Sequence, residues 1–411
     1  MSLSLEEARA RDVADPLRTL RDRFLIPEGL IYLDGNSLGA LPRETVNNQE
    51  DVVRRQWGSS LIRSWNDHRW IDAPQRVGAM IAGLVGAKAH EVIVTDSVTV
   101  NLFKLITAAA RLSPDRPVLL SEAGNFHTDL HVAGGAVEAV PNMRLEIVAR
   151  DKIEEAIGAD TNLLLLTHIH YKSGARFDMG PVTASARQAG ARTIWDLSHS
   201  AGAVPLGLNA EGVELAVGCG YKYLNGGPGA PAFLYVAEDL QEALVPMLRG
   251  WMGHAAPFAF ADEYVPAPGI SRFLAGTPPI LSLTALESGV QSFRDVDMGT
   301  VWAKSVALFD LFATLVDERC AGHGVQCISP ADPERRGSHI SFRHPNAFQI
   351  CQALIEDGVI GDFRAPDVLR FGITPLYLRY EDIWTAVDRL ARILVDEHWR
   401  EPRFALRGKV T

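Results

Sequence analysis

Lys222 lies between two tyrosines and is followed by a glycine-rich run. Residues 218–233 read Gly-Cys-Gly-Tyr-Lys-Tyr-Leu-Asn-Gly-Gly-Pro-Gly-Ala-Pro-Ala-Phe. Glycines at this density let a backbone approach a ligand closely. A partly desolvated lysine loses its proton more easily, and the free amine attacks carbonyl groups to form Schiff bases. The run therefore predicts a lysine that reacts with a carbonyl compound.

A carboxylate and a histidine precede Lys222, after the apolar start of a predicted strand. The segment that begins at Trp195 reads Trp-Asp-Leu-Ser-His-Ser-Ala-Gly and contains Asp196 and His199. Pyridoxal phosphate needs an anion beside its pyridine nitrogen and a lysine on its aldehyde. Asp196 and Lys222 meet these needs, with His199 beside the same carboxylate or the ring hydroxyl. An aspartate that ends a strand is also a common helix cap, but its combination with Lys222 favours the cofactor.

Three further segments supply candidate partners for the cofactor and its substrate. Val98 and Thr99 follow a predicted strand and open an apolar helix, which suits a phosphate group, although Ser and Thr here are also common plain caps. Phe126 could stack on the pyridine ring or fill the core. Arg370 lies in an otherwise apolar strand, where its planar guanidinium suits a carboxylate. A surface ion pair is the alternative role of any single arginine.

Composition argues against several classes of function. The formal charge of −10 over 411 residues argues against general nucleic-acid binding. The four cysteines form no Cys-x-x-Cys pair, so neither a metal site nor a disulfide is predicted. The N-terminus is charged and lacks the apolar stretch of a signal peptide. Since no window approaches the roughly 18 uncharged apolar residues of a membrane helix, we expect a soluble, cytoplasmic protein.

Strands and helices alternate through the middle of the chain. Strands are predicted over 91–95, 117–121, 145–148, 163–168, 191–196 and 232–236, and helices over 43–60, 73–87, 102–110 and 181–189. Near-continuous apolar strands of this kind form a sheet buried on both faces, as in doubly wound α/β domains. Outside this part, helices are predicted over the first 30 residues, 280–318, 346–357 and 380–398. Strands are predicted over 31–33, 337–342 and 369–372.

Together these motifs resemble the kynureninase family, within the fold-type-I pyridoxal phosphate enzymes of the aminotransferase class V group. The resemblance covers nearly the whole chain and includes Tyr-Leu-Asp-Gly-Asn-Ser-Leu-Gly from Tyr32 onward. It implies a large domain with a mostly parallel seven-stranded sheet between helices, and a small α+β C-terminal domain. We expect an N-terminal segment over 1–60, the cofactor domain over 61–280, and a linking helix with the small domain over 281–411.

The resemblance also implies roles for individual residues. Lys222 would be the Schiff-base lysine, Asp196 the partner of the pyridine nitrogen, and Tyr221 a phosphate contact that assists proton transfer. The other implied cofactor-binding residues are Val98, Thr99, Phe126, His127, Thr128, Asp129, Thr167 and His199, with Trp251 and Thr277 reaching the cofactor from the neighbouring subunit of a homodimer. Substrate-binding positions are Arg370, which would clamp the substrate carboxylate, His68 and Ser37. No metal is implied.

The family cleaves L-kynurenine hydrolytically to anthranilate and L-alanine, in tryptophan and kynurenine catabolism and towards NAD biosynthesis. Freed Lys222 would remove the α-proton, and Tyr221 would protonate the alanine fragment. Gly276-Thr277 stands where animal members have Ser-Asn, and His68 falls in a region that shapes the aromatic pocket. We therefore expect a preference for kynurenine, with 3-hydroxykynurenine as a second candidate substrate.

Three alternatives share some of these features. A cysteine desulfurase has the same fold and cofactor, but it needs a nucleophilic cysteine in a mobile loop and usually a histidine just before the lysine, where this chain has Tyr221. An aminotransferase of the same class would transfer the amino group to a keto acid. A non-catalytic dimer scaffold would lack the lysine or the aspartate, and both are present.

Overall fold

The computed structural model describes residues 3–408, which divide into two compact units. The large unit consists of Thr45–Tyr171 and Phe177–Gln291. The small unit contains the chain up to Glu44, the short segment Lys172–Arg176, and the chain from Ser292 onward. Each unit carries its own sheet, so each is described separately.

Seven strands of the described large unit form one sheet in the order β4-β10-β9-β8-β7-β5-β6. β10 runs antiparallel to both of its neighbours, and the remaining pairs are parallel. This confirms the predicted mostly parallel seven-stranded sheet. The strands are β4 (Val92–Val94), β5 (Val118–Glu122), β6 (Arg144–Val148), β7 (Thr161–Thr167), β8 (Arg192–Asp196), β9 (Leu215–Gly218) and β10 (Phe233–Val236).

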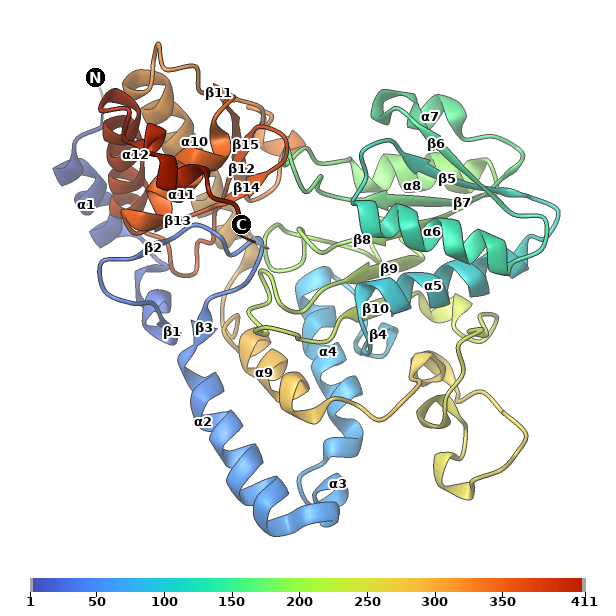
Figure 1. Ribbon diagram of the computed structural model, residues 1–411. Coiled ribbons are helices and arrows are strands. Elements are labelled where there is room, and N and C mark those ends of the chain that lie inside the picture. The colour runs from blue at the N-terminus through green and yellow to red at the C-terminus, as the bar shows by residue number, and fades with distance from the viewer. Residues whose placement is uncertain (1–2, 409–411) are drawn as a thin grey trace. The chain divides into compact units, whose positions relative to one another are not determined.

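Helices cover both faces of this sheet. Successive residues of a strand point to opposite faces, so each strand packs against helices on both sides. Ile194 belongs to the apolar cluster that includes α5 (Val98–Ala109) and α6 (His127–Ala139). Its neighbour Trp195 faces the other way and donates its indole N–H to Thr183 of α8 (Met179–Gln188) at 3.0 Å. The other helices visible in Figure 1 are α3 (Ser64–Asp67), α4 (Ala73–Val85), α7 (Ile153–Ala156) and α9 (Ile280–Gln291), together with α2 (Arg43–Asp51), which belongs to this unit from Thr45 onward.

The small unit is built on an antiparallel sheet in the order β11-β12-β15-β14. Two short pairs accompany it, parallel β2–β13 and antiparallel β1–β3. Its strands are β1 (Phe24–Leu25), β2 (Ile31–Tyr32), β3 (Leu41–Pro42), β11 (Gln326–Cys327), β12 (His339–Arg343), β13 (Val359–Ile360), β14 (Asp362–Arg364) and β15 (Val368–Gly372). Its helices are α1 (Leu5–Ala14), α10 (Met298–Arg319), α11 (Ala347–Glu356) and α12 (Tyr380–Val395).

Two predicted helices are wrong in extent. The single helix expected over 280–318 is two helices, because the chain turns through Asp295 at φ 60° and Asp297 then caps α10 by accepting from the amide of Thr300. The helix expected over the first 30 residues ends at Ala14, shortly before Pro16, whose missing N–H and ring cannot continue a helix. The spacing of the apolar residues over 280–318 did not predict the break between the two helices before Asp297.

α10 is long and apolar enough to cross a membrane by length and composition alone. Half of its apolar window is nevertheless buried in the protein. Partly buried helices of this length are common in the cores of globular domains, so α10 is weak evidence for a membrane protein.

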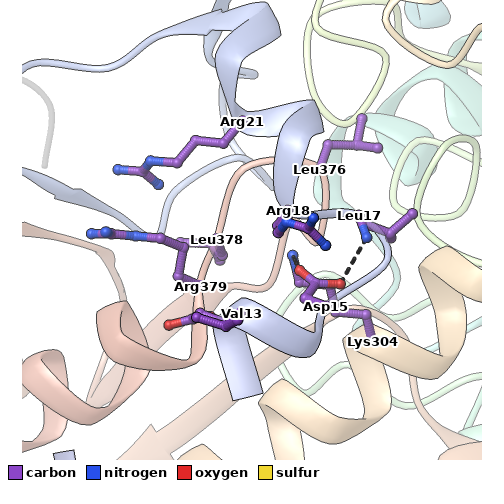
Figure 2. A pocket seen from close by; sticks show the side chains of 10 residues that line it. Val13, Asp15, Leu17, Arg18, Arg21, Lys304, Leu376, Leu378 and Arg379 are labelled. Carbon is purple, nitrogen blue, oxygen red and sulfur yellow. Dashed lines mark hydrogen bonds and ion pairs between the residues drawn. The ribbon is translucent and has the colours of Figure 1, made fainter. Parts of the chain in front are cut away.

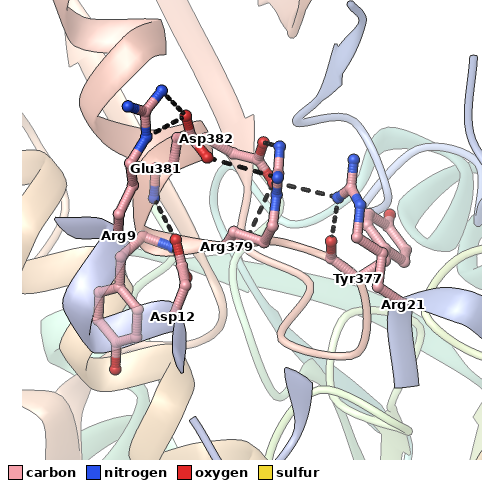
Figure 3. A network of polar contacts seen from close by, with 8 residues as sticks. Arg9, Asp12, Arg21, Tyr377, Arg379, Glu381 and Asp382 are labelled. Atoms are coloured by element: carbon pink, nitrogen blue, oxygen red, sulfur yellow. Dashed lines mark hydrogen bonds and ion pairs between the residues drawn. The ribbon is translucent and has the colours of Figure 1, made fainter. Parts of the chain in front are cut away.

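A polar network holds the N-terminal segment against the start of α12 (Figure 3). Asp382, buried in the first turn of α12, accepts from the backbone N–H of Arg379 at 2.9 Å and from its Nη2 at 2.7 Å. Arg21 donates to the same carboxylate at 3.1 Å and to the carbonyl of Tyr377. Asp12 caps the helix from the other side through the amides of Tyr380 and Glu381.

A cavity of about 240 Å³ lies beside this network within the small unit (Figure 2). Lys304 is buried at its wall, where its Nζ lies 2.6 Å from a carboxylate oxygen of Asp15. The lining residues are Asp12, Val13, Asp15, Leu17, Arg18, Arg21, Lys304, Leu376, Leu378 and Arg379. Within the described chain, none of the residues predicted to bind cofactor or substrate lines this cavity.

Replacing Asp382 with alanine should lower the free energy of unfolding by about 2 kcal/mol, since two guanidinium groups and a helix amide lose a buried acceptor. Asp388→Ala on the same helix is the control, because its pairs with Arg319 and Arg392 are long and partly exposed. That change should cost less than about 0.5 kcal/mol. Urea unfolding followed by circular dichroism measures both, and equal losses would contradict a special role for Asp382.

Candidate active site

The carboxyl ends of β7 and β8 bring two predicted site residues together. Thr167 and Asp196 are register partners at the last paired position of these parallel strands. Both side chains are buried. Ligands of open α/β sheets bind at this edge, so the sheet places Thr167 and Asp196 where a cofactor is expected.

Asp196 is oriented by the turn that follows it. Its Oδ1 accepts from the backbone N–H of Ser198 at 2.8 Å and from the Ser198 hydroxyl at 2.5 Å. Asp129, at the start of α6, is fully buried beside it, and burial followed by the negative charge of Asp196 raises the pKa of Asp129 well above its ordinary value. The buried Asp129 carboxyl therefore holds its proton more firmly than an ordinary aspartate.

Asn125 connects these residues, and the sequence analysis did not single it out. Its side-chain oxygen accepts from the Thr167 hydroxyl at 2.5 Å and from the amide of Phe126 at 2.7 Å, and its nitrogen donates to Ser121 at 3.1 Å. The same Thr167 hydroxyl lies 3.3 Å from Asp129. Asn125 thus ties the end of β5 to the first turn of α6, and its position directly before the Phe126 motif was the available signal.

Lys222 follows β9 and points toward the same group of side chains. Its Nζ lies 3.0 Å from Nε2 of His199 and 5.7 Å from the centre of the Phe126 ring. The ring of Tyr221 is at a similar distance, 5.9 Å. The glycine-rich loop is required by packing, because a Cβ on Gly220 would collide with the carbonyl oxygen of Pro231.

The hydroxyl of Tyr221 is kept protonated by its surroundings. The neighbouring Cys219 sulfur, then burial and the charge of Asp196, raise the pKa of Tyr221 above its ordinary value. A tyrosine with a raised pKa donates hydrogen bonds at neutral pH and holds a proton that it can give to a strong base.

The start of α5 has the geometry expected of a phosphate site. Val98 and Thr99 are its first residues, and Ser97 caps it by accepting from the amide of Val100. The first amides of a helix have no partner within the helix and attract anions. The preceding residue, Asp96, is at φ 48° and forms an ion pair with Lys104, whose Nζ also donates to the carbonyl of Phe273 at 2.6 Å.

The large unit therefore fits pyridoxal phosphate by its own polar groups. Among the described residues, Oδ1 of Asp129 is buried without a hydrogen-bond partner, next to the carboxylate of Asp196. Two buried carboxyl groups, a lysine amine and a phosphate-type helix start lie at the carboxyl edge of one sheet, at strand ends and in the segments that follow strands. A protonated pyridine, an aldehyde and a phosphate are the complements of these groups.

Some predicted site residues stand apart from this group. No described contact joins His68, Trp251 or Thr277 to Lys222 or Asp196. His68 lies 2.9 Å from the hydroxyl of Ser60, Trp251 packs edge-on against Phe258, and Thr277 is exposed. His127 and Thr128 start α6 next to Asp129, with the His127 ring exposed and 4.5 Å from that of Phe126.

The two predicted substrate residues of the small unit, Arg370 and Ser37, contact each other. Nη2 of Arg370 donates to the Ser37 hydroxyl at 2.8 Å. Both also bond to Asp362, a carboxylate that the sequence did not single out. Asp362 and Arg370 are paired across β14 and β15, a register that no short motif reveals.

We expect apoprotein with Asp129→Asn to gain stability relative to wild type as pH rises. Because the native pKa of Asp129 is raised, wild-type stability falls from about pH 4 upward, where the unfolded chain ionises this carboxyl and the folded chain does not. Asparagine removes that dependence. Urea unfolding of both apoproteins at pH 5 and pH 8 tests this, and a difference that is the same at both values would contradict it.

Solved structures similar to this chain share its fold. The apo structure of cysteine desulfurase from Thermococcus onnurineus superposes with a TM-score of 0.77 over 92% of this chain and 98% of that one, at 17% identity. The cysteine desulfurase CsdA from Escherichia coli superposes with a TM-score of 0.77 over 93% of this chain and 98% of that one, at 18% identity. A cystine C-S lyase, C-DES, with glycine covalently linked to its pyridoxal phosphate gives 0.78 over 90% and 98%, at 17% identity.

Sequence relatives are much more similar. Residues 301–390 match the family described as Kynureninase C-terminal domain. The chain is 48% identical over 413 residues to kynureninase of Burkholderia mallei, covering 99% of both chains. It is 45% identical over 409 residues to kynureninase of Pseudomonas fluorescens, covering 98% of both. With such identity over nearly its whole length, the chain belongs to the kynureninase family.

Proposed function

We propose that this chain is an enzyme that cleaves the Cβ–Cγ bond of L-kynurenine with one water molecule, giving anthranilate and L-alanine. The observation that carries this is full-length identity of 45–48% to kynureninases, combined with Lys222, His199 and Asp196 at one edge of the sheet. Pyridoxal phosphate is the cofactor, and it supplies an electron sink that stabilises negative charge on the substrate's α-carbon.

Residues of the large unit would hold this cofactor. Asp196 would face the pyridine nitrogen, supported by the two hydrogen bonds from Ser198. Phe126 would lie against the ring, since Nζ of Lys222 already lies over its face. The amides of Val98 and Thr99 would bind the phosphate. The remaining contacts proposed are His127, Thr128, Asp129, Thr167, His199 and Tyr221 from the same subunit, with Trp251 and Thr277 from its partner.

Two side chains would move protons during the reaction. Nζ of Lys222 would take the proton from the substrate's α-carbon, a role supported by its partly buried position 3.0 Å from His199. The hydroxyl of Tyr221 would give a proton to the carbon left behind when the Cβ–Cγ bond breaks, which the raised pKa of Tyr221 supports. A hydroxyl that holds its proton at neutral pH is suited to donate to a carbanion and unsuited to act as a base.

Three residues would contact the substrate. Arg370 would receive the α-carboxylate, with Ser37 beside it, and His68 would lie near the aromatic ring. We also propose a preference for kynurenine over 3-hydroxykynurenine, supported by Gly276 and Thr277. Comparing kcat/KM for the two substrates tests that preference.

The chemistry of the cysteines argues against a desulfurase with this fold. A nucleophilic cysteine needs a lowered pKa, yet burial is the largest effect on all four thiols and raises their pKa values, in the case of Cys320 to about 12. The four residues are Cys219, Cys320, Cys327 and Cys351.

We further propose that the enzyme is a cytoplasmic homodimer of tryptophan and kynurenine catabolism. Large apolar side chains are exposed on the segment from α2 to the turn before α3, including Trp57 at 56% and Ile62 at 78%. The extended segment after Met247 exposes further large apolar side chains, including Phe260 at 78%. Apolar side chains exposed in such number commonly mark a protein interface, and a second copy of the chain would cover them.

Replacing Lys222 with alanine should abolish both kynurenine cleavage and the visible absorbance band of the bound cofactor. Among the described residues, Lys222 is the lysine whose amine lies beside His199, at 3.0 Å, so no other described lysine should replace it. Lys152→Ala is the control, because Lys152 is exposed and its ion pair within the described chain is with Glu155. Anthranilate fluorescence and an absorbance spectrum provide the measurements, and retention of both signals in the Lys222 variant would contradict the assignment.

Charge placed on the exposed apolar segment should dissociate the homodimer. Ile62→Asp is expected to convert most of the protein to monomer at micromolar concentration, since a carboxylate in an apolar interface loses its hydration. Lys152→Ala again serves as the control. Light scattering after size-exclusion chromatography measures the mass, and an unchanged dimer in the Ile62 variant would exclude this surface as the interface.

A further inference from the structure

Arg370 is held firmly inside the small unit. Its Nε and Nη2 donate to the two oxygens of Asp362 at 2.9 and 2.5 Å, and its side chain is only 1% exposed. The antiparallel register of β14 and β15 places Asp362 directly opposite Arg370, so both side chains leave the same face of the sheet. Asp362 therefore fixes the direction of the Arg370 guanidinium.

Arg364 adds a second guanidinium to this cluster. It lies two residues after Asp362 on β14 and so points to the same face. Its Nη2 donates to Asp362 at 2.6 Å and to the hydroxyl of Ser37 at 3.1 Å. Unlike Arg370, it remains 32% exposed. Arg364 is therefore the more accessible positive charge of the two.

Ser37 organises the two arginines rather than leaving its hydroxyl open. It donates to Asp362 at 2.6 Å and accepts from Arg370 at 2.8 Å as well as from Arg364. A hydroxyl has one donor and two acceptor positions, and all three are filled. The network thus holds both guanidinium groups at one place.

Asp34 is a second buried carboxyl group at this cluster. It starts the turn that carries Ser37, whose amide donates to the Asp34 carbonyl at 2.9 Å. Its Oδ1 is buried and has no hydrogen-bond partner among the described residues. Burial, followed by the charge of Asp362, raises the pKa of Asp34 to about 8, whereas Arg370 and Arg364 outweigh burial and lower that of Asp362 to about 2.

We propose that Arg364 and Asp34 complete the substrate-carboxylate site around Arg370. Arg364 binds the carboxylate directly as a second guanidinium. Asp34 is a positioning residue: its buried carboxyl lies beside the two guanidinium groups, and in its neutral form it adds no second negative charge next to Asp362. This inference rests on the proposed function, since it takes the substrate to be an α-amino acid bound at Arg370.

The protonation of Asp34 predicts a direction for the effect of pH. Asp34 interacts with Tyr32 from β2, Cys351 from α11, Asp362 from β14 and Arg370 from β15, and Arg364 lies next to Asp362. Burial raises the pKa values of Tyr32 and Cys351, so both stay neutral while Asp34 titrates. As pH rises through about 8, Asp34 ionises and adds a negative charge to the cluster, so carboxylate binding weakens.

The first experiment separates carboxylate binding from other contacts by using two probes, L-alanine and L-alaninamide. Each is titrated into holoenzyme while the visible absorbance of the cofactor is recorded. Arg364→Gln should weaken L-alanine binding about tenfold or more and leave L-alaninamide unchanged, since only the former carries the charge that Arg364 pairs with. Arg364→Lys should recover part of the affinity.

Arg343→Gln is the matched control, because Arg343 lies on β12 of the same sheet and pairs with Asp367 at 3.2 Å. It should bind both probes like wild type. Unchanged L-alanine affinity in Arg364→Gln would overturn the role of Arg364. If kynurenine is not cleaved but wild type still prefers L-alanine to L-alaninamide through Arg364, the proposed reaction fails and the carboxylate site stands.

The second experiment tests Asp34 by measuring the L-alanine affinity of the Asp34→Asn variant and of wild type at pH 7 and at pH 9. At each pH, the affinity of the variant is divided by that of wild type. Titrations of the probe amine and the cofactor cancel in this ratio. It should be near one at pH 7 and rise several-fold at pH 9, where wild-type Asp34 is mostly ionised. Asp34→Ser gives the same test if the asparagine variant folds poorly. A ratio that does not change with pH would overturn the role of Asp34.

Discussion

The site depends on buried carboxyl groups at the carboxyl edge of the parallel sheet. Asp196 ends β8 and Asp129 begins α6, and both carboxyl groups are buried. Burial and the negative charge of Asp196 raise the pKa of Asp129, so this pair favours a positively charged group beside it. On our proposal, Lys222 and the protonated pyridine of the cofactor are those groups.

The small unit contains a second cluster of buried charged groups. There Asp362 binds the guanidinium groups of Arg364 and Arg370, and burial raises the pKa of Asp34, which on our proposal favours binding of the substrate carboxylate. Both clusters are carried by strand ends and the tight turns beside them. Strand pairing orients the side chains, while burial controls their protonation.

Much of the site could be predicted because its residues stand in short local motifs. The leucine run of β7 and the glycine loop after Lys222 are visible without any knowledge of contacts. The short strand β9 was missed, since Leu-Ala-Val-Gly is too brief to show a pattern. Asn125 and Asp362 were also missed, because their roles come from hydrogen bonds to residues distant in sequence, through a loop conformation and a strand register. Such pairings arise only when the chain folds.

The central claim is that this chain hydrolyses L-kynurenine at its Cβ–Cγ bond. Its most direct test is the stoichiometry of products formed by purified protein supplied with pyridoxal phosphate and L-kynurenine, without any keto acid. The account predicts anthranilate and L-alanine in equal amounts, each matching the kynurenine consumed. Consumption of kynurenine without anthranilate, or turnover that requires a keto acid, would contradict it.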